Sequence, residues 1–221
     1  NIEDALKMAE CVSGDSVFAH SLAFCQAVEK IYNIEVPKNF QYLRAAFLEL
    51  ERMYNHVNDV GGMALDVSFS FSSAYASLIK ESLLALNKRL MGHRYLRGVS
   101  TIGGLKKCFT KNERFVLHNS LELILKDFNE LKNILLSSIS FMDRVDSTGI
   151  LRKNTAEDMG VVGLVGRASG INMDLRKHFP AIYDNVKFNM IKHSKGDALA
   201  RLSVRLDEFE ESVKIIRQCI E

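Results

Sequence analysis

Apolar residues recur at alternating steps of three and four between Pro37 and Asp66, and this spacing predicts one long amphipathic α-helix. The apolar face consists of Phe40, Leu43, Phe47, Leu50, Tyr54 and Val57. A second stripe, with its members four residues apart, consists of Arg44, Leu48, Arg52 and His56. Because a proline is tolerated in the first turn of a helix, Pro37 fits the start of this element. We expect the rest of the chain to be organised around it.

Helical spacing also predicts shorter elements before and after this segment. Residues 2–12 form one helix, and either Asp15 or Ser16 can cap the helix that follows. Another helix covers residues 70–91 and ends at Gly92, as helices commonly do at glycine. Its predicted inward positions are Tyr75, Leu78, Leu83, Leu86 and Leu90.

The second half of the chain contains two further helical patterns. Thr110 and Glu113 form a T-x-x-E capping box at the start of a long helix that continues to about Arg144. A final helix begins near Lys195 and keeps strict three-four spacing of apolar residues to the end. An apolar face this complete indicates antiparallel packing against other helices of a bundle.

Two glycine-rich stretches interrupt the helical pattern. Residues 92–108 contain four glycines, β-branched residues and five basic side chains, which indicates a loop with short strands. Those basic side chains either face a phosphate or an acidic partner, or they are simply solvated. Residues 158–183 also contain four glycines, but they do not form G-x-G-x-x-G and no βαβ pattern surrounds them, which argues against a dinucleotide fold.

Composition supports a mainly α fold in a single domain that covers residues 1–221, a helical bundle with a small β or loop appendage. Of the 221 residues, 47% are hydrophobic and 25% are charged, which are ordinary globular values. A net charge of +2 gives no argument for nucleic acid. No apolar run approaches the roughly 18 residues that a membrane span needs, so we expect no direct membrane insertion. The chain starts without methionine and stops inside a helical pattern, so we interpret it as the central fragment of a larger polypeptide.

The cysteines are scattered and form no C-x-x-C pair. They are Cys11, Cys25, Cys108 and Cys219. This spacing indicates neither a disulfide framework nor a zinc site, and we expect all four to be small buried apolar residues in a reducing compartment. The sequence therefore predicts no metal site and no cofactor held by this chain.

Asp66 is the first candidate for a functional residue. It follows Gly61 and Gly62 and is flanked by apolar residues, which suggests a carboxyl group removed from bulk water. Burial would raise its pKa, whereas His56 or Arg52 nearby would lower it. His56 lies ten residues earlier, so a contact would require a break at the glycines. The alternative is that Asp66 caps the next helix.

Four blocks of sequence, in this order, carry a resemblance to a known family. They are S-G-D-S-V-F-A-H-S (13–21), V-P-K-N-F-Q-Y-L-R-A-A-F-L-E-L-E-R-M-Y-N-H (36–56), G-L-V-G-R-A-S-G-I-N-M-D-L-R (163–176) with the following Pro180, and G-D-A-L-A-R-L-S-V-R-L-D-E-F (196–209). Together they resemble the catalytic large subunit of energy-converting NiFe hydrogenases, which includes the formate hydrogenlyase large subunit. They also resemble its relative, the 49 kDa quinone-site subunit of respiratory complex I, the NADH dehydrogenase.

The resemblance implies a set of site residues. Asp66 falls on the quinone-site acid of complex I, and other positions match the family pattern. The implied catalytic residues are Asp66, His56, His20 and Arg167. The implied cofactor-binding residues are Arg94, Gly103, Gly104, Asp174 and Arg176. From the residues alone, a lone histidine such as His20 on an amphipathic helix is more often structural than a ligand.

The departures from the hydrogenase pattern concern the metal. Hydrogenases of this family carry C-G-x-C before the A-H-S sequence, and here Ser13 and Ser16 occupy the two cysteine positions. Serine hydroxyls do not replace thiolates at a soft nickel–iron site, so a NiFe cofactor is disfavoured. The second cysteine pair of hydrogenases would lie beyond Glu221, and the histidine loop that meets the quinone in complex I would lie before Asn1.

The resemblance implies an oxidoreductase subunit in which electron transfer is coupled to proton uptake by buried carboxylate and histidine groups. An iron–sulfur small subunit and membrane subunits would be its partners, on the inner, cytoplasmic face of the cytoplasmic membrane. A quinone would bind in the complex, and NAD(H) would act at most through a partner subunit. The alternatives are a scaffold subunit without redox chemistry and a true hydrogenase, which Ser13 and Ser16 disfavour. We expect the isolated fragment to be inactive.

Overall fold

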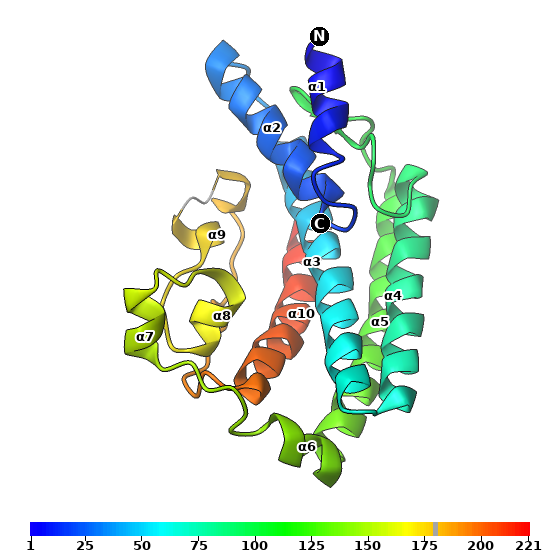
Figure 1. The fold of residues 1–221 in the computed structure, drawn as a ribbon. Helices are drawn as coiled ribbons and strands as arrows, with labels where there is room; N and C mark the ends of the chain where they lie inside the picture. Colours follow the sequence, from blue (N-terminus) through cyan, green and yellow to red (C-terminus); the bar gives the residue numbers. More distant parts are fainter. Residues whose placement is uncertain (179–180) are drawn as a thin grey trace.

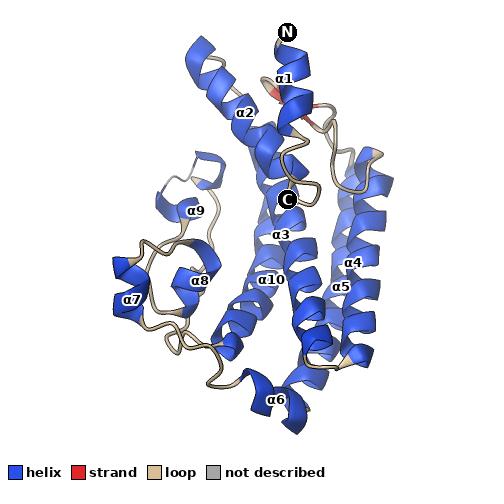
Figure 2. Ribbon diagram, viewed as in Figure 1, coloured by secondary structure: helices blue, strands red, loops and turns tan. Residues whose placement is uncertain are grey.

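The computed structural model describes residues 1–178 and 181–221, so Pro180 of the third block lies outside the described residues. The described part is mainly helical, with one two-stranded sheet (Figures 1 and 2). Its elements are α1 (Ile2–Ala9), α2 (Val17–Tyr32), α3 (Lys38–Asp66), α4 (Ser70–Met91), β1 (Ser100–Thr101), β2 (Gly104–Leu105), α5 (Lys111–Ser137), α6 (Ile139–Val145), α7 (Lys153–Asp158), α8 (Gly163–Ala168), α9 (Leu175–His178), η1 (Ala181–Tyr183) and α10 (Ala198–Ile220). The predicted mainly α fold with a small β appendage is confirmed.

Helix α3 is the central element, and its predicted extent is confirmed to within one residue. It packs against α4 on one side and α10 on another, while α5 packs against α4 and α10 (Figure 1). The small helices α7, α8 and α9 lie on the other flank of α10 (Figure 1). Leu50, Tyr54 and Val57 of the predicted apolar face are fully buried, because these neighbours cover that face of α3.

The close packing of α3 and α4 depends on a glycine. A Cβ atom built on Gly61 would lie 2.9 Å from the Cβ of Ala76 on α4, which is closer than ordinary carbon contacts. At the neighbouring Gly62 a Cβ atom would meet nothing within 4 Å. The helix continues through both glycines to Asp66, so neither glycine breaks it. Gly61 therefore allows the two helices to approach.

The first turn of α2 is capped from α3 and not by its own flanking residues. Ser16 occupies the N-cap position, but its side chain makes no capping hydrogen bond. Instead, the Glu51 carboxylate accepts hydrogen bonds from the backbone N–H groups of Phe18 at 2.8 Å and Ala19 at 2.9 Å. The prediction of a cap from Asp15 or Ser16 is wrong, because a carboxylate distant in sequence satisfies these donors.

A buried arginine attaches the small hairpin to the helices. Arg44 on α3 pairs with Glu29 on α2 at 2.6 Å and donates to the carbonyl oxygens of Thr101 and Gly104. The backbone N–H of Gly103, between the two antiparallel strands, donates to Glu29 at 2.7 Å. The loop with short strands predicted for residues 92–108 is confirmed (Figure 2). The Arg44–Glu29 ion pair holds it in place.

Helix ends in the second half of the chain follow their capping residues. The Thr110–Glu113 capping box is confirmed. The helix predicted to reach Arg144 ends at Ser137, because Ser138 takes an extended conformation and caps α6. Helix α10 starts after Asp197, whose carboxylate accepts from the N–H of Ala200 at 2.7 Å.

The four cysteines divide into two groups. Cys25 and Cys219 are buried, as predicted, whereas Cys11 and Cys108 are exposed. The prediction fails for these two because Cys11 follows the end of α1 and Cys108 lies in the loop before α5. Within residues 1–178 and 181–221, no helix is both long and apolar enough to cross a membrane.

Candidate ion-paired site between helices α3, α8 and α10

Two completely buried carboxylates lie where α3 meets α10. One is Glu208 on α10, which pairs with His56 Nε2 at 2.7 Å. The same carboxylate accepts from the guanidinium of Arg167 on α8, at 2.9 Å from Nε and 2.5 Å from Nη2. Three separate helices therefore meet at one carboxyl group.

The second carboxylate is Glu49 on α3. It accepts from Tyr183 Oη at 2.6 Å and from Ser212 Oγ at 2.5 Å. It also pairs with Arg176 at 3.3 Å and with Arg52 at 3.2 Å. Arg176 in turn pairs with Asp174 at 2.7 Å. We call the connected groups the ionic centre; they are Glu49, Arg52, His56, Arg167, Asp174, Arg176 and Glu208.

Local sequence explains how these side chains are presented. Glu49, Arg52 and His56 are spaced by three and four residues, so they project from one face of α3. On the opposite side, Gly166 lets the carbonyl oxygen of Val161 approach α8 closely, because a Cβ atom there would lie 2.9 Å from that oxygen. The carbonyl of Arg167 accepts from the N–H of His193, which fixes the end of α8.

The electrostatic balance keeps both buried glutamates ionised. Burial alone would raise the pKa of Glu49, but Arg52 and Arg176 together with the hydrogen bonds hold it below its ordinary value. Burial also opposes ionisation of Glu208, yet His56 and the arginines depress its pKa well below the ordinary range. For His56 the burial effect dominates and lowers the pKa. At neutral pH the ionic centre therefore holds charged carboxylates beside a neutral imidazole.

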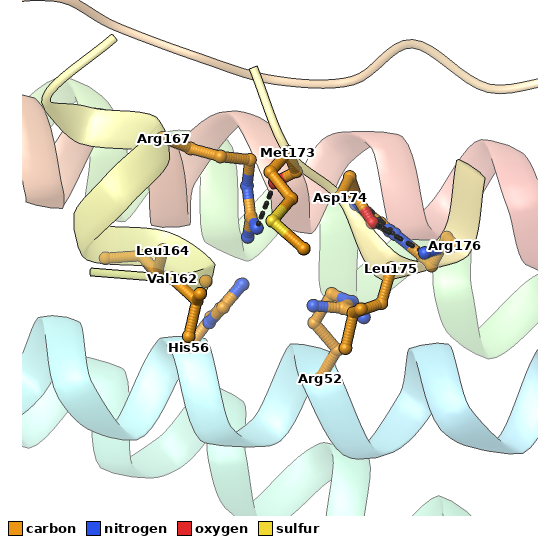
Figure 3. Close-up of a pocket in the computed structure, with 10 residues that line it drawn as sticks. Arg52, His56, Val162, Leu164, Arg167, Met173, Asp174, Leu175 and Arg176 are labelled. Atoms are coloured by element: carbon orange, nitrogen blue, oxygen red, sulfur yellow. Dashed lines mark hydrogen bonds and ion pairs between the residues drawn. The ribbon is translucent and has the colours of Figure 1, made fainter. Parts of the chain in front are cut away.

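A cavity of about 350 Å³ opens beside the ionic centre (Figure 3). It is lined by Arg52, His56, Val162, Gly163, Leu164, Arg167, Met173, Asp174, Leu175 and Arg176. A second cavity of about 290 Å³ shares Arg52, Leu175 and Arg176 with the first. Since Glu49 and Glu208 are fully buried, the polar wall of the first cavity consists mainly of guanidinium groups and an imidazole. Such a wall can donate hydrogen bonds to an acceptor and can take up a proton at His56.

The structure brings together four residues that the resemblance implied and separates the others. His56, Arg167, Asp174 and Arg176 all belong to the ionic centre. His20 lies at the start of α2, half-buried and away from this centre.

The remaining glycine and arginine positions have structural contacts in the described residues. Arg94 forms an ion pair with Glu81 at 2.5 Å near the surface. Gly103 takes a positive φ of 82° in the hairpin turn. A Cβ atom on Gly104 would lie 2.9 Å from the ring of Phe40, so close packing requires a glycine there. These contacts give each of the three residues a structural role.

Asp66 departs from both sequence interpretations. It is exposed, so the expectation that it is removed from bulk water is wrong for the described residues. It is the last residue of α3, and Phe69 occupies the N-cap position of α4 without a side-chain capping bond, so the capping alternative is also wrong. The continuous helix keeps it about 15 Å along the axis from His56, which excludes direct contact.

Sequence reasoning missed the acids at the middle of the centre, Glu49 and Glu208, and the hydroxyl groups of Tyr183 and Ser212. A signal was present in the spacing of Glu49, Arg52 and His56, since three titratable groups share one helix face. The partners of these three residues could not be predicted from the sequence, because Glu208, for example, lies 152 residues from His56.

Comparison with known proteins defines the class first: a mainly helical chain of a family of respiratory-chain dehydrogenase subunits. Residues 66–221 match the profile of the family described as "Respiratory-chain NADH dehydrogenase, 49 Kd subunit". The chain belongs to this family.

Curated relatives agree with this assignment. The chain is similar to a subunit of the NADH-quinone oxidoreductase of Clostridium beijerinckii, with 34% identity over 203 residues that cover 91% of this chain and 55% of the relative. The corresponding NADH-quinone oxidoreductase protein of Deinococcus radiodurans is 33% identical, with 91% of this chain and 50% of the relative covered. NADH-quinone oxidoreductase subunit 4 of Thermus thermophilus is 34% identical, with 92% of this chain and 50% of the relative covered. The chain thus spans about half the length of these relatives.

Proposed function

We propose that the protein is the large subunit of a membrane-associated oxidoreductase complex of the NADH:quinone oxidoreductase kind. In this proposal electrons come from an iron–sulfur partner, a quinone accepts them, and buried groups of this chain take up protons. The observation that carries the proposal is the ionic centre with its cavity, placed in a chain of the 49 kDa family. Because the chain spans about half of its relatives, the activity is proposed for the whole protein.

The chemistry available at the ionic centre is proton binding. Neutral His56 donates its Nε2–H to ionised Glu208, and protonation of the imidazole would convert this contact to an ion pair. Added negative charge nearby favours the protonated imidazole, since an opposite charge raises a histidine pKa. Electron arrival close to the cavity would therefore be accompanied by proton uptake at His56.

Asp66 keeps a proposed quinone-site role through the resemblance alone. Its carboxylate is exposed at the end of α3, so the other walls of that site would come from segments or partners beyond the described residues. Membrane subunits would hold the protein on the inner, cytoplasmic face of the cytoplasmic membrane, and NAD(H) would react at a partner subunit.

The hydrogenase alternative, formate hydrogenlyase included, requires a nickel–iron site that the available donors do not fit. Ser13 Oγ donates to the Asp15 carboxylate at 2.5 Å, and Ser16 Oγ lies 3.4 Å from the same carboxylate. Hydroxyl and carboxylate oxygens are hard ligands, whereas nickel–iron chemistry in these enzymes needs thiolates. The proposal therefore contains no step at nickel.

The scaffold alternative has one observation in its favour. Glu49 and Glu208 remain ionised, so their ion pairs can simply hold α3, α8, α9 and α10 in place. A scaffold role and a proton-handling role differ at His56, because only the second requires a group that changes charge.

The test is His56→Gln in the assembled complex. Glutamine can still donate a hydrogen bond to Glu208 but cannot take up a proton, so we expect at least about a tenfold loss of quinone-reductase kcat. Assembly is checked by the subunit composition of the purified complex. Lys195→Gln, which removes an exposed ion pair with Asp146, is the control and should keep normal turnover. Normal turnover of His56→Gln in a fully assembled complex would instead support the scaffold alternative.

A further inference from the structure

A third buried glutamate lies on α3 outside the ionic centre. The Glu51 side chain belongs to a residue that is 3% exposed, next to Arg52 in sequence but directed toward α2. Its hydrogen bonds come from neutral groups: the N–H groups of Phe18 and Ala19 and the hydroxyl of Tyr54 at 3.1 Å. Glu49 and Glu208 differ from it, because both pair with arginines.

The Tyr54 hydroxyl has two acceptors and one hydrogen. Its oxygen lies 2.8 Å from the carbonyl oxygen of Asp15 and 3.1 Å from Glu51 Oε2. While Glu51 is ionised, the single phenolic hydrogen is shared between these acceptors. When Glu51 carries a proton on Oε2, it can donate to Tyr54 Oη, and Tyr54 then donates fully to Asp15. The same atomic positions therefore accommodate one more hydrogen than the ionised state contains.

Burial and a nearby negative charge favour this extra proton near neutral pH. Burial is the largest effect and raises the pKa of Glu51 to about 7, against the lowering effect of the Ala19 and Phe18 N–H groups and of Tyr54. Asp15, in the loop before α2, adds negative charge and raises the pKa further. The Tyr95 ring packs edge-on against the Tyr54 ring, with 5.7 Å between the ring centroids. The Ser13 hydroxyl and, to a smaller extent, Lys80 on α4 lower the pKa of Asp15.

We propose that Glu51 is a proton-accepting residue of this domain and that Tyr54 connects it to the loop of residues 13–16. A hydronium ion of the solvent transfers its proton to Oε2 and becomes water, the carboxylate becomes a carboxylic acid, and no other bond of the protein changes. Its part in turnover rests on the function proposed above, whereas its protonation does not. Glu51 would supply proton uptake at the α2 side of α3, separate from His56 at the α10 side.

Infrared difference spectroscopy of the purified protein tests the protonation directly. The carbonyl stretch of a protonated carboxyl group should grow between about pH 8 and pH 6 in the wild type and be missing in Glu51→Gln. Glu10→Gln is the matched control, because Glu10 is also buried and also caps a backbone N–H, that of Gly98 at 2.6 Å. This control should keep the band.

Tyr54→Phe tests the hydrogen-bond relay. Without the phenolic oxygen the acid loses its acceptor, so the band should remain but move to higher frequency and titrate at a different pH. Hydrogen exchange of the Phe18 and Ala19 amides shows whether each variant keeps the first turn of α2. A band that persists in a folded Glu51→Gln variant, or that never appears in the wild type, would overturn the proposal.

Turnover of the full complex tests the role. The pH profile of quinone reduction in Glu51→Gln should lose its change near neutral pH, while Glu10→Gln keeps it. A Glu51→Gln profile identical to wild type would overturn the role of Glu51 in proton uptake and leave the proposed function standing. A wild-type complex without quinone-reductase activity would overturn the proposed function, and the infrared titration would still decide whether Glu51 binds the proton.

Discussion

Arg44 and Arg94 show how differently the same side chain behaves at two depths. Arg44 is 1% exposed and donates to Glu29 and to two backbone carbonyl oxygens. Arg94 makes a bidentate pair with Glu81 at the surface, where water competes for both partners. The buried pair is therefore expected to fix structure, whereas the surface pair is not.

Arg44→Met should destabilise the protein strongly. The substitution would leave Glu29 buried without its cation and would leave the carbonyl groups of Thr101 and Gly104 without this donor, at a cost of roughly 3–5 kcal/mol. The free energy of unfolding in urea measures the effect. Arg94→Gln is the control and should change it little; a loss in Arg44→Met as small as that of the control would contradict the assignment.

For single residues, the sequence predicted some members of the site correctly and was wrong about the surroundings of others. The resemblance implies His56, Arg167, Asp174 and Arg176, and the structure joins them in the ionic centre. Asp66 was expected to be buried because apolar residues flank it, but a tight turn follows it and leaves it in solvent. Flanking residues report local polarity, whereas burial depends on which distant element covers a position.

Helix packing between α3 and α4 gives a prediction at the scale of elements. Gly61→Ala would bring two Cβ atoms to 2.9 Å and force the helices apart, with an expected loss of roughly 1–3 kcal/mol. Gly62→Ala meets no neighbour and should instead stabilise the helix by about 0.5–1 kcal/mol. Thermal or urea unfolding of both variants measures the difference. Equal effects of the two substitutions would show that the helices do not pack as described.

The positions of the long helices were predictable from spacing, and their ends only where a capping residue marked them. Thr110 and Glu113 marked α5 correctly, but Ser138 gave no clear signal and separates α5 from α6. Helical spacing predicts an inward position for Leu78, yet this residue is 65% exposed, because α4 contacts its neighbours through the face that holds Ile79 and Leu83. Helix α4 carries two stripes of apolar residues. Which stripe is buried depends on the helices that pack against α4, and the spacing within α4 does not show this.

The pH dependence of stability belongs to the whole molecule, because opposing groups contribute. Glu49, Asp174 and Glu208 have depressed pKa values, so the stability they contribute is present above the ordinary carboxyl pKa and is lost as pH falls through their folded values. Glu51 acts in the opposite sense. Its pKa is raised to about 7, so the folded state binds more protons, and stability falls as pH rises toward that value.

Comparison of wild type with Glu51→Gln isolates this second effect. From about pH 5 to pH 8 the wild type should lose roughly 3 kcal/mol of unfolding free energy relative to the variant, since each unit of pKa shift corresponds to about 1.4 kcal/mol. All other titrating groups are common to both proteins and cancel. Urea unfolding at several pH values measures the difference, and a constant difference across this range would contradict the raised pKa.

Helix α2 is attached to α3 by polar contacts at both ends of α2. Arg44 holds Glu29 near the last turn of α2, while Glu51 holds the N–H groups of its first turn. The two anchors are seven residues apart on α3, about two turns or 10 Å, so they leave from one side of that helix. Burial raises the pKa of the Glu51 anchor to about 7, so this contact changes charge near neutral pH. Since a carboxylic acid accepts hydrogen bonds less strongly than a carboxylate, we expect protonation of Glu51 to weaken the contact at the first turn of α2, while the Arg44–Glu29 pair still holds its last turn beside the hairpin.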